Sequence, residues 1–260
     1  MNDSSQRQMQ ALARISDIPA AIGLLTRLPI RVDTTKAIAR GAQAAWAWPL
    51  VGAIPALALW GVASLALNAG LPALWAATLG LLVQVVLTGA MHEDGLSDSA
   101  DGLWGGFERT RRLEIMKDSR IGAYGVIALI LSLLLRATAL AVILPLPGAI
   151  WALVVIGLVS RLPMVLLMGS LPNARDDGLA HHVGRPGAAT MGLASSLVAV
   201  VTLVLCPWAI APLLVICSAG TIAVAALAKG KIGGQTGDIL GASQQVTEVL
   251  ALAVFAALMA

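Results

Sequence analysis

Residues 92–125 read HEDGLSDSADGLWGGFERTRRLEIMKDSRIGAYG and lie between two long apolar runs. Charged residues are scarce elsewhere, since the 260-residue chain is 58% hydrophobic and 12% charged, with a mean hydropathy of +0.86. A soluble domain would carry about 25% charged residues. The apolar blocks approach the ~20 residues that a helix needs to cross a bilayer. We therefore expect an all-α, polytopic transmembrane helix bundle, formed as one integral membrane domain over residues 1–260.

Six apolar runs are long enough to be full spans. A seventh, at 246–260, is marginal in length and could cross the bilayer or only dip into it. Near the N-terminus, residues 15–30 are apolar but are interrupted by Pro19, Arg27 and Pro29, which predicts an interfacial or re-entrant helix. The six predicted full spans cover about residues 47–67, 71–91, 125–144, 148–168, 190–205 and 212–227.

The polar segments all fall on one side of the predicted membrane. With this set of spans, residues 92–125, 169–189 and 229–245 share the side of the N-terminal 44 residues, whereas apolar turns occupy the other side. Lys and Arg are frequent in these segments, and loops rich in Lys and Arg face the cytoplasm. The functional surface is therefore expected on the cytoplasmic face.

Three aspartates in the central segment have helical spacing. Asp94, Asp98 and Asp101 stand at i, i+4 and i+7, so on a helix they project within about 60° of one another. Three carboxylates on one stripe repel each other, and a divalent cation would relieve that repulsion. Hard oxygen ligands favour Mg²⁺ or Mn²⁺.

A second pair of carboxylates follows a glycine break. Glu114 and Asp118 repeat the i, i+4 spacing after Gly105 and Gly106, which could let a second helix fold back beside the first. Five carboxylates would then face each other and could hold two metals that stabilise the attacking and leaving oxygens of a phosphoryl transfer. The alternative is a solvated loop with ordinary surface ion pairs.

Further candidates lie outside the central segment. Arg136 and Arg161 occur within apolar spans, where a charge should face the bundle and have a partner. They could neutralise a diphosphate, or pair with Glu248 or an aspartate. Asp238, in the glycine-rich run GGQTGDILGA, could help to close a site or could cap a helix, and Arg175 could bind an anionic substrate or only mark the cytoplasmic side.

Several of these motifs together resemble the cobalamin synthase family, the adenosylcobinamide-GDP ribazoletransferases. They are HEDGLSDSADGLWGG, LEIMKDSRIGAYG and GGQTGDILGA, with GLLTRLPI near the N-terminus and a loop that runs from Arg175 to Gly178. A weaker likeness links the chain to CDP-alcohol phosphotransferases, whose pattern is matched in part by Asp98-x-x-Asp101-Gly102. In that pattern the Ala-Arg pair is missing here, and a glutamate stands where that family has an aspartate.

The first resemblance implies a reaction and its location. α-Ribazole, or its 5′-phosphate, attacks the phosphate attached to cobinamide in adenosylcobinamide-GDP, and GMP leaves. The product is adenosylcobalamin or its 5′-phosphate, and the location is the bacterial inner membrane. For this chemistry we expect Mg²⁺ on Asp94, Asp98 and Asp101 with Glu114 as a fourth ligand, Asp118 and Asp101 as the catalytic carboxylates with Asp118 as the base, and Arg120, Arg161, Arg136, Arg175 and Asp238 around the substrate.

Partners and alternatives complete the expectations. The lipid bilayer is a partner, no nucleic acid is expected, and the oligomeric state is left open, a homo-oligomer included. The alternatives are a CDP-alcohol-type phospholipid phosphotransferase and, in a different class, a cation transporter that uses the acidic residues as an ion path. A transporter should place carboxylates near the middle of several spans, whereas most lie at span ends here.

Overall fold

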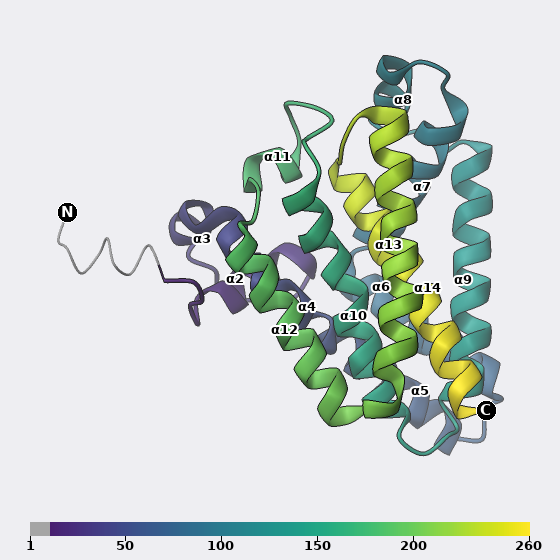
Figure 1. Cartoon of the computed structure of the whole chain (residues 1–260). Helices are drawn as coiled ribbons and strands as arrows, with labels where there is room; N and C mark the ends of the chain where they lie inside the picture. The colour runs from purple at the N-terminus through teal and green to yellow at the C-terminus, as the bar shows by residue number, and fades with distance from the viewer. Residues whose placement is uncertain (1–10) are drawn as a thin grey trace.

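The structure, a computed structural model, describes residues 11–260 and shows a helical bundle (Figure 1). No β-strand occurs in that part of the chain, which confirms the all-α prediction. Within residues 11–260, six helices are long and apolar enough to cross a membrane, as a polytopic bundle requires. Four of them are single helices: α9 (Ala123–Ile143), α10 (Ala149–Ser170), α12 (Ala188–Leu205) and α14 (Gly237–Met259). The span Thr34–Asn68 consists of α3 (Thr34–Arg40), η1 (Gly41–Ala47), α4 (Trp48–Val51) and α5 (Ala53–Asn68). The span Pro207–Ile232 consists of η2 (Pro207–Ala209) and α13 (Ile210–Ile232).

Two predicted segments differ from the observed helices in whether they are long enough to cross the membrane. The final run was expected to be marginal, but it belongs to α14, whose 23 residues begin at Gly237 because the polar residues before the run continue the same helix. The predicted span 71–91 is shorter, since α6 (Ala73–Thr88) has 16 residues. α6 reaches the length of a span only together with α7 (Met91–Gly105), and the two helices meet at an angle of 87°.

The bend between α6 and α7 comes from two consecutive left-handed residues. Gly89 has φ 65° and Ala90 has φ 56°. A positive φ is uncommon for a residue with a side chain. Gly89 also needs its bare Cα, because a Cβ there would lie 2.3 Å from Nε of Arg27. The bend directs the polar helix α7 away from the axis of α6.

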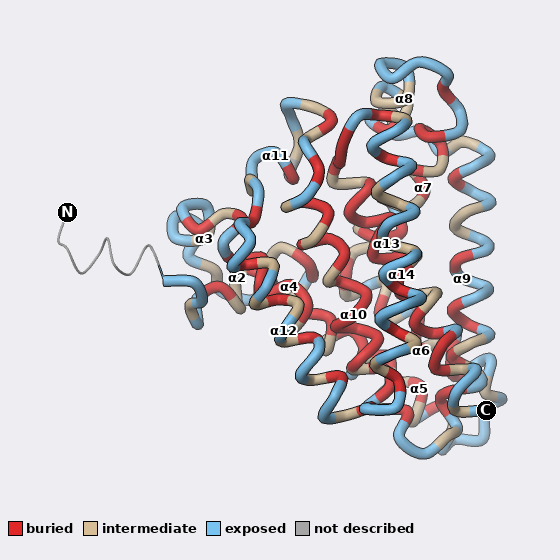
Figure 2. Tube along the Cα trace, viewed as in Figure 1, coloured by how far each residue is buried: buried red, intermediate tan, exposed pale blue. Residues whose placement is uncertain are grey.

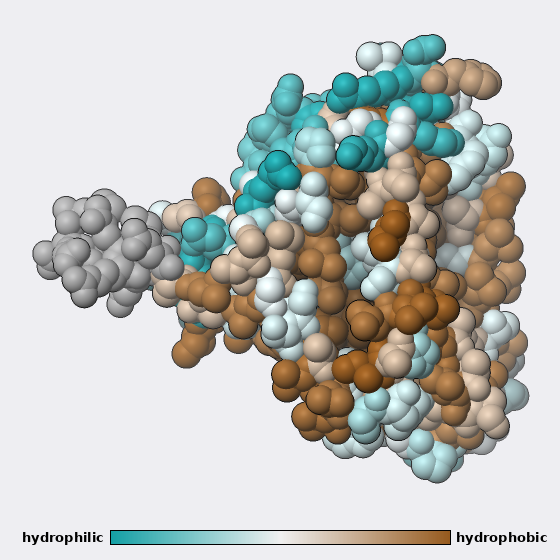
Figure 3. Space-filling view, viewed as in Figure 1, coloured by the Kyte–Doolittle hydropathy of each residue, from teal (hydrophilic) through white to brown (hydrophobic). Residues whose placement is uncertain are grey.

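The bundle is organised around α10 and α14. Buried residues concentrate on these two helices (Figure 2), whereas α9, α12 and α13 expose apolar side chains on their outer faces. Figure 3 shows hydrophobic side chains around the lower part of the molecule and hydrophilic ones over the end that carries α8 (Arg109–Ile115) and α11 (Leu179–Val183). This pattern is that of a membrane protein with one polar end.

Arg109 joins the three polar segments at that end. Its Nε donates to the backbone carbonyl of Ile232 at 2.8 Å, and its Nη2 donates to the carbonyl of Ala174 at 3.0 Å. The predicted polar segments 92–125, 169–189 and 229–245 therefore do share one end of the bundle.

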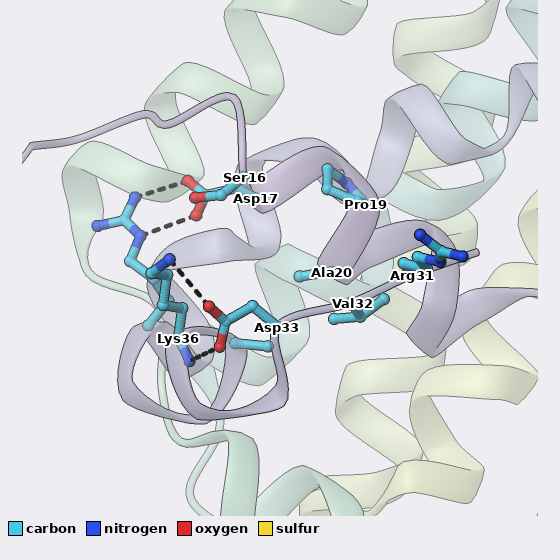
Figure 4. A pocket seen from close by; sticks show the side chains of 10 residues that line it. Ser16, Asp17, Pro19, Ala20, Arg31, Val32, Asp33 and Lys36 are labelled. Atoms are coloured by element: carbon cyan, nitrogen blue, oxygen red, sulfur yellow. Dashed lines mark hydrogen bonds and ion pairs between the residues drawn. The ribbon is translucent and has the colours of Figure 1, made fainter.

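The N-terminal part contains the short helix expected within 15–30. This helix, α2 (Asp17–Leu25), is held by a buried ion pair, in which Nη2 of Arg40 lies 2.7 Å from Oδ2 of Asp17. Nε1 of Trp46 donates to the same oxygen at 2.8 Å. A pocket of about 210 Å³ lies beside this pair, and Lys36 pairs with Asp33 on its rim (Figure 4). These contacts fasten α2 and α3 to the bundle.

Candidate active site

α7 presents its acidic residues on two neighbouring stripes. Glu93, Ser97 and Asp101 are buried and lie along the side that faces α9, whereas Asp94 is exposed and Asp98 is half-buried. Asp101 is fixed by the start of α9, since the backbone N–H groups of Gly122 and Gly125 donate to its two oxygens at 2.7 and 2.9 Å. A carboxylate that accepts the free N–H groups of a helix start stabilises that helix.

Asp98 faces the first turn of α14. The helices touch through Gly95, where a Cβ would lie 2.8 Å from the backbone oxygen of Asp238 and 3.1 Å from Cα of Gly241. Asp98 belongs to α7, a polar helix that is not one of the six membrane spans. Burial and, after it, the negative charges of Asp94, Asp238 and Asp101 together raise the pKa of Asp98 to about 7. The carboxylates are therefore close enough to repel one another.

Arg175 is a cation beside this cluster. Its Nη2 lies 3.2 Å from Oδ2 of Asp238, and its charge partly offsets the rise in the pKa of Asp98. The loop that carries Arg175 is held against the start of α14 by two backbone hydrogen bonds, from the N–H of Ala174 to Gln235 and from the N–H of Gln235 to Pro172, both 2.8 Å. Arg175 and Asp238, predicted separately from the sequence, thus lie in one place.

Glu114, Asp118 and Arg120 lie elsewhere on the surface. The exposed Glu114 pairs with Arg111 at 3.1 Å, and Asp118 pairs with Arg120 at 2.6 Å. The expected convergence of five carboxylates is therefore not observed. α8 packs on α7 through Arg112 and Met116, the side chains nearest to Gly106 and Gly102, and no residue of α8 itself is buried.

The electrostatics of Asp118 bear on its predicted role as a base. Hydrogen bonds from the Arg120 side chain and backbone lower the pKa of Asp118 to about 2. A carboxylate with so low a pKa is a weak proton acceptor at neutral pH. The assignment of Asp118 as the base stays a prediction, and it would require the pair with Arg120 to open.

Arg136 and Arg161 are both buried inside the bundle. Arg136 is 0% exposed and forms ion pairs with Glu93 at 2.8 Å and Glu248 at 3.0 Å. The pairing with Glu248 is the alternative that the sequence left open. Nη1 of Arg161 donates to the backbone oxygen of Gly157 at 3.1 Å. Contacts of either arginine with substrate stay predictions.

Glu93 is a residue that the sequence reasoning missed. Its only signal is its position, four and eight residues before Ser97 and Asp101, which places it on their buried stripe. Spacing alone does not reveal a partner on another helix, and Arg136 is 43 residues away in the chain.

Residues 17–256 match the family described as cobalamin-5-phosphate synthase. The chain belongs to this family. It is 42% identical over 244 residues to a protein of Bradyrhizobium diazoefficiens named adenosylcobinamide-GDP ribazoletransferase, and the match covers 94% of each chain. A relative of the same name from Azorhizobium caulinodans is 42% identical over 256 residues, with 90% of this chain and 93% of the relative covered. Another, from Allorhizobium ampelinum, is 40% identical, with 95% and 99% covered. No solved structure matches.

The chemistry of the acidic cluster suits a hard divalent cation. Asp94, Asp98 and Asp238 supply carboxylate oxygens, which Mg²⁺ prefers, and a cation would relieve the repulsion seen at Asp98. Among residues 11–260, no three His, Cys, Asp or Glu side chains converge as a ready coordination sphere. In the arrangement described, Asp101 accepts backbone N–H groups, and Glu114 pairs with an arginine. The donor types therefore fit the cation, and the ligand set stays a prediction.

Proposed function

We propose that this member of the family acts as an adenosylcobinamide-GDP ribazoletransferase. A ribose hydroxyl of α-ribazole, or of its 5′-phosphate, forms a new bond to the phosphate attached to cobinamide. The bond between the two phosphates breaks, GMP leaves, and the hydroxyl proton passes to a base. The observation that carries the proposal is the cluster of Asp94, Asp98, Asp238 and Arg175 at the polar end of a chain that matches enzymes of this name over nearly its full length.

The roles of the residues follow from what phosphoryl transfer requires, namely positioning and neutralisation of charge. Asp94 and Asp98 would hold Mg²⁺, with Asp101 and Glu114 as the further ligands expected from the sequence. The cation would neutralise the diphosphate. Arg175 offers a guanidinium beside the cluster, where it can orient an anionic phosphate by paired hydrogen bonds.

The proposal includes a place for the reaction in the cell. The enzyme would lie in the bacterial inner membrane with its polar end in the cytoplasm. The abundance of Lys and Arg in the segments at that end supports this orientation. A large amphiphilic corrinoid could then bind from the membrane surface while the nucleoside arrives from water.

A direct assay tests the reaction. Purified protein in detergent or nanodiscs, given Mg²⁺, adenosylcobinamide-GDP and α-ribazole, should release GMP, which chromatography measures. A chelator should stop the release, and added Mg²⁺ should restore it. Asp98→Asn should lower the release of GMP. Its matched control is Glu108→Gln, which changes an exposed carboxylate outside the cluster and should leave the release unchanged. Absence of GMP with folded protein and active substrates would refute the proposal.

The two alternatives predict different products. A phospholipid phosphotransferase would join a CDP-alcohol to a lipid acceptor, and a transporter would carry cations into proteoliposomes without any corrinoid. One observation counts against an ion path: Glu93 and Glu248, two carboxylates in the bundle interior, are both ion-paired with Arg136. Cation uptake by reconstituted protein would support the transporter instead.

A further inference from the structure

A network of polar side chains lies inside the bundle, close to the acidic cluster. Its centre is Arg136 of α9, whose guanidinium contacts Glu93 of α7 at 2.8 Å and Glu248 of α14 at 3.0 Å. All three side chains are buried, with whole-residue exposures of 0%, 7% and 3%. One guanidinium thus joins three helices, and two of them carry the carboxylates of the candidate site.

Neighbouring amides complete the network. Gln84 donates to Glu248 at 2.8 Å, Gln244 donates to the other oxygen of Glu248 at 2.5 Å, and Oε1 of Gln245 accepts from Arg136 at 2.9 Å. The buried Arg161 adds a second positive charge, so two arginines balance two glutamates. Buried side chains with paired, hydrogen-bonded charges favour a single arrangement of the helices that carry them, because any other arrangement would leave a buried charge without a partner.

This network acts on the helix that presents Asp94 and Asp98. Glu93 directly precedes Asp94, so the ion pair with Arg136 fixes the rotation of α7 about its axis. The far end of α7 is held on the same helix, α9, by the contacts of Asp101 with two backbone N–H groups. Glu248 of α14 is tied to the same guanidinium, ten residues after Asp238.

We propose that Arg136 is a positioning residue, which holds α7 and α14 in the register at which Asp94 and Asp98 face Asp238. It does so without touching substrate, because its side chain is enclosed by the bundle. The inference rests on the proposed function for its consequence in catalysis, but the register that it describes can be measured by metal binding alone. Partners that orient metal ligands typically change metal affinity by about 10- to 100-fold when they are removed.

The test uses Mn²⁺ as the probe and the full-length protein without substrates. The double variant Glu93→Gln/Arg136→Gln removes one charge of each sign and leaves Glu248 to balance Arg161. Electron paramagnetic resonance should show Mn²⁺ binding weakened by about 10- to 100-fold, with an unchanged elution volume in size-exclusion chromatography. The control is Thr138→Ala, on the same helix, whose exposed hydroxyl donates to backbone carbonyls of α9 itself. It should bind Mn²⁺ as the wild type does.

A second variant covers the case in which the double variant does not fold. Arg136→Lys keeps the buried charge but replaces a planar fork, which reaches both glutamates, by a single ammonium group. It should weaken Mn²⁺ binding by less than the double variant and by more than Thr138→Ala. In both folded variants, kcat for GMP release should fall while KM for the corrinoid stays near the wild-type value.

The outcomes separate this inference from the proposed function. Wild-type Mn²⁺ affinity in a folded variant, or a wild-type protein that binds no Mn²⁺, would overturn the positioning role even where GMP is released. Failure of both variants to fold would make Arg136 a structural residue only, and would overturn the positioning role as well. Weakened Mn²⁺ binding with no GMP from the wild type would keep the positioning role and refute the assigned reaction.

Discussion

The contact of Gly95 with α14 supports a quantitative prediction. A Cβ at this position would lie 2.8 Å from the backbone oxygen of Asp238, 3.1 Å from Cα of Gly241 and 3.2 Å from Cα of Asp238. All three neighbours are backbone atoms, which cannot rotate away as the end of a side chain can. Gly95→Ala should therefore push α7 and α14 apart.

The size of the displacement follows from the same distances. Ordinary contact begins at 3.4 Å, so the nearest atom must move by about 0.6 Å. Catalytic groups need to be held within about 0.5 Å of their productive positions, and a misplacement of about 1 Å can cost about 100-fold in rate. We expect kcat to fall by about 10- to 100-fold with little change in KM, and stability to fall by about 1–3 kcal/mol from overpacking.

The measurements are GMP release at saturating substrates and thermal unfolding of the detergent-purified protein. The matched control is Gly105→Ala at the end of the same helix, where the nearest atom to a Cβ would be 3.7 Å away. It should retain wild-type kcat. If Gly95→Ala also turns over and unfolds as the wild type does, the direct backbone contact does not set the spacing between Asp98 and Asp238.

Four further changes probe other parts of the chain. Asp98→Asn should lower GMP release by at least about 10³-fold without lowering the unfolding temperature, because it removes a repelled charge, and a marked loss of stability would contradict this. Asp101→Asn should instead cost about 1–3 kcal/mol in unfolding as well as activity, since one amide oxygen replaces two acceptors; unchanged stability would refute the anchoring contact. Arg112→Met should lower the free energy of unfolding by about 1–3 kcal/mol, because two backbone carbonyls lose a charged donor. It should also expose the polar loops to protease, and wild-type protease resistance would contradict this prediction. Asp17→Asn should lower the free energy of unfolding by about 3–5 kcal/mol, because it leaves Arg40 buried without its charged partner. Thermal unfolding would show or rule out this loss.

Apolar run length predicts α9 and α10 well. The expected spans 125–144 and 148–168 agree with α9 and α10 to within a few residues, because nearly every residue in them is apolar. The same reasoning places the start of α14 too late. Its first half carries Ser243, Gln244 and Glu248, which face polar partners inside the bundle, and hydropathy cannot distinguish a polar residue with a buried partner from one in a loop.

Spacing predicts the site only in part. It places Asp94 and Asp98 on one side of a helix, and the structure adds Asp238 beside them. The side chain of Asp101 turns instead toward the N–H groups that begin α9, a partner that the period of one helix cannot show. Glu114 has helical spacing too, but it finds an arginine on its own helix, at a site open to water.

The left-handed pair at Gly89 and Ala90 also bears on how the chain enters the membrane during synthesis. A straight continuation of α6 would carry Asp94, Asp98 and Asp101 about 32–42 Å from its first residue, at about 1.5 Å per residue, and so beyond a hydrocarbon core of about 30 Å. Because the bend of 87° separates the two halves, the apolar half can enter lipid as a segment of its own, and the acidic half turns to pack against α9 and α14. The bend thus lets an acidic motif directly follow an apolar segment without projecting away from the bundle.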